Sequence, residues 1–354
     1  MGKVMLKKLT HIFIAFFFLL FSGCATITGP AVTREEIERT KEELKVKALA
    51  YQIKQLQRLQ NIGQRLMQSI PQEDIKHPPQ PSLGIMCAQI DRYLKKIYNL
   101  SVDKGVVIIV VKEQSPAFES GLQPADVLVS INKIKIDDIY RFSAVVSKFK
   151  INDLLKLEIL RGNQTMDLEV KIGKIPVNLP IIMVDLPEVN AATDGESIFV
   201  TYGLMNFARS DDEIAAILAH ELAHAVRGHV SKAEGGQILT WLAALALGIA
   251  AESISPGSGE GVMSGVDQIG NIFTTAYSRD LEREADYFGT KFVYYAGYDV
   301  ETCAQVEERF AIEIPASMID NFLSTHPSSP ERVARIRKTI EELKVAKLSS
   351  QKQE

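Results

Sequence analysis

The sequence contains few cysteines and no excess of positive charge. Its 354 residues include three cysteines, at positions 24, 87 and 303, too few for a fold held together by disulfides. Cys87 and Cys303 can pair in an oxidising compartment or remain as two buried free thiols, and the second is the simpler interpretation. The formal net charge is −4. Without a strongly basic surface to neutralise phosphates, the chain is not expected to bind nucleic acid.

Two long hydrophobic runs are both too short to span a bilayer. Residues 12–21 are apolar throughout, and residues 238–251 are apolar apart from Thr240 and Gly248. A helix rises about 1.5 Å per residue, so neither run crosses a hydrocarbon core about 30 Å thick. We expect the second run to be a core helix, although a lid or a membrane-touching hairpin would use the same residues.

Loops typical of two other enzyme classes are absent as well. The glycine-rich stretch 255–261 follows no strand and is not closed by Gly-Lys-Ser/Thr, which excludes a nucleotide-binding loop. The chain has no Gly-x-Ser-x-Gly, so a serine peptidase is not expected. The composition is that of a globular protein, with 46% hydrophobic and 24% charged residues. At about 150 residues per domain, the length predicts about two domains.

The first residues have the pattern of a bacterial export signal. Three lysines precede the apolar run, which ends in Phe21-Ser22-Gly23-Cys24. Small residues before a cysteine resemble the lipobox of bacterial lipoproteins. This resemblance implies that residues 1–23 are removed and that Cys24 is lipidated, and Ala25 after the cysteine favours the outer membrane. We therefore expect an exported, periplasmic protein held at the membrane by a lipid anchor. Ordinary signal cleavage, leaving a free thiol at Cys24, is the alternative.

A long amphipathic helix is expected after the anchor. Thr33 and Glu36 have the spacing of a capping box, and Pro71 ends the helical pattern. Apolar residues recur in steps of three and four, on one face of a helix over about 34–70: Leu49, Ile53, Leu56, Leu59, Ile62, Leu66 and Ile70. We expect this face to pack on the rest of the protein or on a second copy, so an oligomer is possible. Helix and proline-rich linker together occupy 24–81.

Residues 82–174 change to short β-rich runs. Strands are expected at 106–111, 127–131 and 154–160. The motifs Ser115-Pro116-Ala117, Gly121-Leu122-Gln123-Pro124-Ala125-Asp126-Val127-Leu128 and Ile131-Asn132 resemble a PDZ domain of the bacterial protease type. The resemblance implies that Leu83, Gly84 and Ile85 form the loop that binds a peptide's C-terminal carboxylate, beside which the peptide adds as a strand. The alternative is a PDZ spacer whose groove is filled from within the same chain.

The chemistry of the chain is expected on a helix that begins after Ser210. This helix carries His220-Glu221-Leu222-Ala223-His224. Two histidines four residues apart lie one above the other on a helix, so both imidazoles can reach one metal ion. Glu221 points about 100° away around the axis, where it can meet a water bound to that ion. His229, after a glycine near the helix end, is interpreted as structural.

A third metal ligand is expected from a second helix, which ends near Gly297. Glu282 and Asp286 are four residues apart and share one face, so Glu282 can bind the metal while Asp286 stands behind it. Glu284 is the rival for the third ligand. Exposed carboxylates on a charged helix are the alternative interpretation.

Three ordered motifs resemble the zinc metallopeptidase family that includes HtpX, BepA and the CAAX prenyl proteases. They are His220 to His224, Glu282 to Asp286, and Ser324-Thr325-His326-Pro327; residues 189–192 and 198–200 resemble that family's edge strand above the cleft. The resemblance implies one zinc per chain, bound by His220, His224 and Glu282, with Glu221 as general base and Asp286 as the hydrogen-bond partner of a ligand. It covers the domain expected at 175–345, ahead of a polar tail at 346–354.

The expected fold is α+β: a mostly helical HExxH peptidase domain preceded by a β-rich PDZ domain and an amphipathic helix. The expected function is a membrane-anchored zinc endopeptidase of the cell envelope, acting on polypeptides in protein quality control. Glu221 would take a proton from the attacking water. His326 would stabilise the oxyanion, occupy a fourth zinc position that keeps the enzyme latent, or only cap loop backbone. Arg332 would stabilise that loop or bind a substrate carboxylate, and the peptide would add to a strand near 198–201.

A second function class stays open at this point. The chain could be a PDZ-based interaction or chaperone protein whose metal site is structural or held shut.

Overall fold

The computed structural model describes residues 29–75, 77–230, 277–313, 326 and 329–351. The expected signal peptide, Cys24 and the apolar run 238–251 lie outside these residues. Among the described helices, none is both long enough and apolar enough to cross a membrane. The chain divides into two compact units, residues 1–45 and 46–354.

The described part of the first unit holds the start of the long helix α2 (Arg34–Ser69). The Thr33 backbone N–H donates to the Glu36 carboxylate at 2.7 Å, and the Glu36 N–H donates to the Thr33 hydroxyl at 3.2 Å. The capping box expected from the sequence is therefore confirmed, since two otherwise unpaired backbone donors are satisfied. The helix ends at Ser69, just before Pro71, as expected.

In the second unit, the apolar face of α2 is buried along its length. Ile53 and Leu56 belong to a hydrophobic cluster with strand β3 (Val106–Val111), and Leu59, Ile62 and Leu66 belong to the core around helix α7 (Asp211–Arg227). The prediction that this face packs on the rest of the protein is confirmed. One helix thus contributes to two hydrophobic cores.

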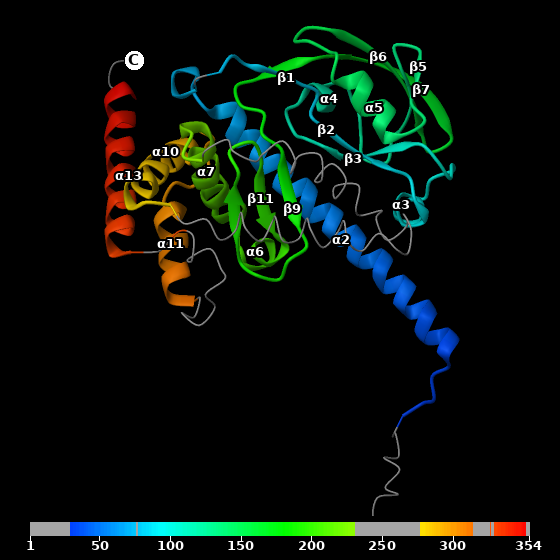
Figure 1. The fold of residues 1–354 in the computed structure, drawn as a ribbon, viewed down its shortest axis with the longest axis horizontal. Coiled ribbons are helices and arrows are strands. Elements are labelled where there is room, and N and C mark those ends of the chain that lie inside the picture. The colour runs from blue at the N-terminus through cyan, green and yellow to red at the C-terminus, as the bar shows by residue number, and fades with distance from the viewer. Residues whose placement is uncertain (1–28, 76, 231–276, 314–325, 327–328, 352–354) are drawn as a thin grey trace, which may run out of the picture. The chain divides into compact units, whose positions relative to one another are not determined.

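Residues 80–175 form an antiparallel sheet in the order β2-β3-β4-β6-β7, with β5 paired to β4 (Figure 1). The predicted strands at 106–111, 127–131 and 154–160 are confirmed within one residue. The elements are β1 (Gln80–Ser82), β2 (Ile85–Gln89), α3 (Arg92–Tyr98), β3, α4 (Pro116–Glu119), β4 (Val127–Ile131), β5 (Ile134–Lys135), α5 (Ile139–Val146), β6 (Leu154–Arg161), β7 (Gln164–Lys171) and β8 (Gly173–Ile175). Strand β2 lies at the sheet edge, while β1 and β8 pair with each other where the segment begins and ends.

The remaining residues of the second unit form a small sheet covered by helices. Its strands have the order β10-β11-β9, and helices α7, α10, α11 and α13 pack against one another beside it (Figure 1). The elements are η1 (Gln72–Asp74, before the PDZ sheet), β9 (Ile181–Val184), β10 (Ala191–Thr193), β11 (Ile198–Thr201), α6 (Tyr202–Phe207), α7, α10 (Arg279–Tyr295), α11 (Thr302–Glu313) and α13 (Pro330–Gln351).

The expectation that a peptide adds to the strand near 198–201 is wrong. Strand β11 lies between β10 and β9, so its backbone groups are paired on both sides. Its four residues are all buried. The edge of this sheet next to α7 is β10 instead.

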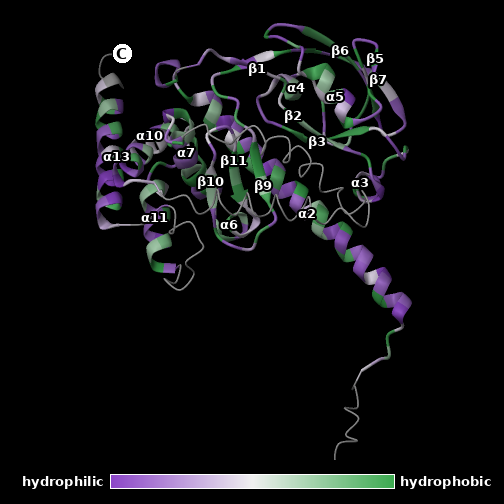
Figure 2. Ribbon diagram, viewed as in Figure 1, coloured by the Kyte–Doolittle hydropathy of each residue, from purple (hydrophilic) through white to green (hydrophobic). Residues whose placement is uncertain are grey.

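Hydrophobic residues concentrate where these layers meet. Figure 2 shows β9 and β11 strongly hydrophobic and most of α13 hydrophilic.

The thiols of Cys87 and Cys303 are both free; Cys303 is buried in the core around α7, and Cys87 is half-buried against the core of the sheet that contains β2 and β3. Both thiols are free, as expected, but only Cys303 is buried, whereas both were expected to be.

The core position of α2 predicts a large effect of truncating Leu59, which is fully buried. Leu59→Ala should lower the free energy of unfolding by about 3 kcal/mol, because it removes buried surface and leaves a cavity. Leu44→Ala on the same helix, where the side chain is 59% exposed, should change it by less than about 0.5 kcal/mol. Urea unfolding followed by circular dichroism measures both, and equal effects would contradict the packing of α2 described above.

Candidate metal centre and active site

Helix α7 presents the HExxH residues on its buried side. The Ser210 hydroxyl accepts a hydrogen bond from the Glu213 N–H at 3.2 Å, which begins the helix, and Gly228 ends it with a φ of 75°. His220 and His224 lie one turn apart, and together with Glu221 they are almost completely buried. A buried charged or polar side chain needs a partner, so this helix face requires one from elsewhere in the fold.

Helix α10 supplies the partners. Glu282 and Asp286, one turn apart on its buried face, are 3% and 6% exposed. The two helices come together at Gly289, where a Cβ atom would lie 3.1 Å from both the backbone nitrogen and the Cα of His220. A larger residue at 289 would therefore push α10 away from the histidines. Sequence reasoning did not identify this glycine.

The ligand atoms of this cluster have the spacing of a tetrahedral metal site. The Nε2 atoms of His220 and His224 lie 3.1 Å apart, and the Glu282 carboxylate oxygens lie 3.5 Å and 3.3 Å from them. Zinc–ligand distances of about 2.0–2.1 Å place tetrahedral ligands about 3.3 Å apart. The geometry therefore fits a zinc ion held by two imidazoles and one carboxylate.

His326 is the fourth member of the cluster. Its Nδ1 lies 3.1 Å from Nε2 of His220 and 2.9 Å from Oε1 of Glu282, while its Nε2 lies 3.2 Å from Oε1 of Glu221. The side chain is fully buried. The ring thus stands between the metal-binding atoms and Glu221, which disfavours the interpretation of a loop histidine that only caps backbone.

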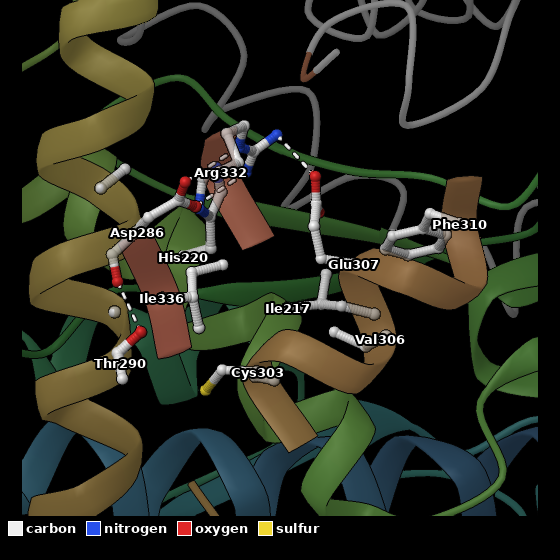
Figure 3. A pocket seen from close by; sticks show the side chains of 13 residues that line it. Ile217, His220, Asp286, Thr290, Cys303, Val306, Glu307, Phe310, Arg332 and Ile336 are labelled. Carbon is white, nitrogen blue, oxygen red and sulfur yellow. Dashed lines mark hydrogen bonds and ion pairs between the residues drawn. The ribbon is translucent and has the colours of Figure 1, made fainter. Parts of the chain in front are cut away.

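Asp286 backs His220 and is itself held by Arg332. The Nδ1 atom of His220 lies 3.1 Å from the Asp286 carboxylate, and Arg332 donates two hydrogen bonds of 2.8 Å to that carboxylate. Arg332 also pairs with Glu282 at 3.2 Å and with Glu307 at 3.3 Å. Figure 3 shows Asp286, His220, Arg332 and Glu307 around a small cavity between the helices. Arg332 also donates to the His326 carbonyl at 3.2 Å, which agrees with the expectation that it stabilises that loop.

Glu284, the rival third ligand, is not part of the cluster. Its carboxylate accepts a hydrogen bond of 2.7 Å from Arg227 and lies 3.3 Å from Nε2 of His229. The Nδ1 of His229 lies 3.0 Å from Nδ1 of His224. His229 and Glu284 therefore back His224 as Asp286 backs His220, which would hold the outer nitrogen of a ligand and fix its tautomer.

The charges of the site favour a cation. Among the described residues, Glu282, Asp286 and Glu307 are buried and paired with Arg332, while the buried Glu221 lies 3.2 Å from His326. Burial alone would lower the pKa of His220, but the nearby charges of Glu282 and Asp286 raise it to about 10. Burial lowers the pKa of His224 to about 3 and raises the pKa of Glu221. His220 thus carries a proton at the place where a metal ion would supply positive charge. The neighbouring His224 is neutral and can act as a ligand.

Tyr277 covers the cluster and was not identified from the sequence. Its ring stacks on the His224 ring with 3.8 Å between centroids, and its hydroxyl donates to the Thr193 carbonyl at 3.4 Å. Burial and the charges of Glu221 and Glu282 raise its pKa, so the hydroxyl keeps its proton. The one available signal was its position directly before Ser278, the N-cap of α10.

The PDZ loop expected at 83–85 leads into the edge strand β2. The Gly84 carbonyl accepts from the Lys112 N–H at 2.8 Å, and the Leu83 carbonyl accepts from the Ala117 N–H at 3.0 Å. Gly84 has a φ of +84°, and a Cβ there would lie 2.1 Å from the Ser115 Cβ, so only glycine fits. Both carbonyls are thus paired within the domain, and the role of the loop's N–H groups as donors to a ligand carboxylate stays a prediction.

Comparison with known proteins identifies both regions. Residues 170–340 match the model of peptidase family M48, and residues 81–172 match that of the PDZ domain. Metalloprotease YcaL of Escherichia coli (strain K12) is 31% identical over 203 residues, which cover 52% of this chain and 76% of that protein. The chain belongs to peptidase family M48. This family is zinc-dependent, in agreement with the ligand types and spacing of the cluster.

Two further relatives are longer than the matched region. The mitochondrial metalloendopeptidase OMA1 of Arabidopsis thaliana is 33% identical over 158 residues, covering 44% of this chain and 30% of that protein. A putative beta-barrel assembly-enhancing protease of Vibrio cholerae is 32% identical over 155 residues, covering 42% of this chain and 31% of that protein. The chain thus spans about a third of the length of these two relatives.

The geometry predicts that Glu282, and not Glu284, is required for zinc binding. Glu282→Gln should remove zinc after dialysis against a weak chelator, because it takes away a charged ligand at the centre of the site. Glu284→Gln should keep about one zinc per chain with an affinity reduced by about 10–100-fold, since it only weakens the support of His224. Metal analysis with chelator competition measures both variants, and zinc retention by Glu282→Gln would contradict the ligand assignment.

Proposed function

We propose that this chain is a zinc endopeptidase of the bacterial cell envelope that hydrolyses peptide bonds in polypeptides. The single observation that carries the proposal is the buried cluster of His220, His224 and Glu282, whose atoms have zinc-site spacing, with Glu221 one residue from a ligand on the same helix. Family membership supports the same chemistry.

The residues divide into those that would hold zinc and those that orient them. His220 and His224 would bind through Nε2 and Glu282 through its carboxylate. Asp286 and His229 would accept the protons on the outer nitrogens, as their 3.1 Å and 3.0 Å contacts allow. A zinc ion bound there would supply Lewis-acid chemistry, polarising a carbonyl and lowering the pKa of a water toward 7.

Glu221 is the proposed general base. Burial raises the pKa of its carboxyl, which brings a carboxylate closer to the basicity that proton transfer near neutral pH requires. The carboxylate would take a proton from the attacking water and deliver it to the leaving amine. A bound cation would keep Glu221 ionised in this buried place, since the positive charge offsets the cost of burial.

His326 is proposed as a fourth zinc ligand that keeps the enzyme latent. Its Nδ1 stands at the remaining corner of the cluster, at ligand-like distances from His220 and Glu282. In this position the ring excludes a water from Glu221, so the residue must move before catalysis. If His326 instead stabilised the oxyanion, its ring would lie beside the reaction centre and would leave the fourth ligand position empty.

The substrate is proposed to be an unfolded or C-terminally exposed polypeptide. The PDZ domain supplies the loop at Leu83, Gly84 and Ile85 and the edge strand β2, both suited to a peptide end. The expected export signal and lipidated Cys24 would hold the enzyme at the periplasmic face of the outer membrane. Protein quality control follows from this combination of anchor, peptide-binding domain and peptidase. The domain limits of 82–174 and 175–345 are part of the same proposal.

Replacing the general base should separate catalysis from metal binding. Glu221→Gln should lower the rate of casein cleavage by at least about 10³-fold, because proton transfer is lost, while zinc content stays near one per chain. Glu341→Gln, at an exposed position of α13, is the matched control and should cleave at the wild-type rate. Cleavage by Glu221→Gln at the wild-type rate would refute the role of the base.

The same experiment tests the second function class. If wild-type protein with bound zinc never cleaves casein or unfolded peptides but suppresses their aggregation, the interaction or chaperone function replaces the peptidase. In that outcome the zinc site is structural or stays shut.

Removing the His326 imidazole distinguishes the two roles left for it. If the ring holds the site shut, His326→Ala should raise kcat by about tenfold or more, since a latch worth about 1.4 kcal/mol keeps about a tenth of the molecules open. If the ring stabilises the oxyanion, kcat should fall by about 10²–10³-fold. His77→Ala, at an exposed histidine, is the control. A fall in kcat would overturn the latch.

A further inference from the structure

Strand β10 is the edge strand of its sheet beside the metal centre, and its three residues are buried, as those of β11 are. The Thr201 N–H donates to the Asn190 carbonyl at 3.0 Å, and the Asp194 N–H donates to the Ser197 carbonyl at 3.3 Å. Hydrogen-bonded positions alternate along an antiparallel pair, so Ala191 and Thr193 point their backbone groups away from β11. Within the described part of the chain, no strand pairs with that side. Ala191 and Thr193 are 0% and 3% exposed, so a peptide adding to this sheet would pair with them only after the groups that bury them move aside.

Tyr277 occupies this edge. Its hydroxyl donates to the outward carbonyl of Thr193, the same acceptor that the N–H of an added peptide would use. At 3.4 Å the bond is long, so an amide donor at about 2.9 Å would replace it favourably. The ring lies against the metal-binding residues, 3.8 Å from the His224 centroid and 5.3 Å from the His326 centroid. Tyr277 thus contacts both the strand where the peptide is expected to bind and the residues that are expected to hold the zinc.

We propose that Tyr277 is a catalytic residue, whose hydroxyl leaves Thr193 when a substrate strand binds and then donates a hydrogen bond to the carbonyl oxygen of the scissile bond. This inference rests on the proposed peptidase function and adds a residue to it. The phenol keeps its proton throughout, so no covalent bond is made or broken at Tyr277. Its contribution is a hydrogen bond that strengthens as negative charge develops on that oxygen.

Among the residues that the structure describes, two other polar side chains near the cluster are committed elsewhere. Arg332 is bound to Asp286, Glu282 and Glu307. Asp194 accepts from the Glu196 and Ser197 N–H groups within its own turn. The carboxylates of the site can only accept hydrogen bonds when ionised. Tyr277 is a neutral donor whose present partner is one that substrate binding would take over.

The test compares zinc-loaded wild-type protein with Tyr277→Phe and the control Tyr287→Phe, a tyrosine of α10 that is 42% exposed. Tyr277→Phe should lower kcat for a fluorogenic peptide by about 10²–10³-fold while KM stays within about twofold. Zinc content and Tm should match those of Tyr287→Phe. Unchanged kcat in Tyr277→Phe would overturn the proposal. An increase in KM at constant kcat would also overturn it, because that result indicates that Tyr277 only holds the backbone at Thr193 in place.

A binding measurement gives a second readout that does not depend on turnover. A peptide phosphonamidate carries a tetrahedral anionic group resembling the charged state of the carbonyl, whereas a product peptide does not. Tyr277→Phe should weaken phosphonamidate binding by about 10–100-fold and leave product-peptide binding unchanged. Equal losses for both would overturn the proposal. If wild-type protein cleaves nothing, the peptidase function fails and the catalytic role of Tyr277 fails with it; active wild-type protein with equal losses for both ligands overturns the role of Tyr277 alone.

Discussion

The structure depends on burying four carboxylates around one small volume. Glu221, Glu282, Asp286 and Glu307 are withdrawn from water; Arg332 pairs with the last three, and Glu221 lies beside His326. Burying unpaired charge is among the costliest things a fold can do. A divalent cation bound to these groups would offset part of this cost, since ligand binding to the folded state adds directly to stability. Metal binding would therefore stabilise the fold in this part of the chain.

Close helix packing is what brings the charges together. Gly289 allows α10 to lie against the backbone of α7 at His220, and Asp286 and Glu282 then reach the two imidazoles from a single helix face. The outer partners differ between the two histidines. His220 is backed directly by a carboxylate, and His224 is backed through His229. Both arrangements fix ring orientation, but the second inserts a titratable group between ligand and carboxylate.

Local pattern predicted most of the site. The spacing of His220, Glu221 and His224 needs only helical geometry, and Glu282 with Asp286 repeats that spacing, so their convergence followed from two amphipathic helices. The resemblance to a known family brought in His326 from a distant loop. The limits appear where a contact is tertiary. Nothing local distinguishes Glu282 from Glu284 beyond that resemblance, and Tyr277 becomes meaningful only when β10 is placed opposite it.

Strand order was the other limit. Residues 198–201 form a short apolar run, and such a run fits an edge or a centre equally well until its neighbours are known. Parallel pairing with β9, which is distant in sequence, makes β11 central. By contrast, the PDZ strands followed from runs of β-branched residues bounded by turns, where sequence neighbours pair antiparallel.

The pairing of β1 with β8 bears on how this protein can gain or lose a domain in evolution. Ser82 and Gly173 are cross-strand partners, so the ninety residues between them leave and re-enter the chain at adjacent points. Excising that segment would need only a tight turn to rejoin the backbone, and inserting one would leave the rest of the connectivity intact. The PDZ domain can therefore be inserted, exchanged or lost in evolution without a change in the connectivity of the peptidase domain.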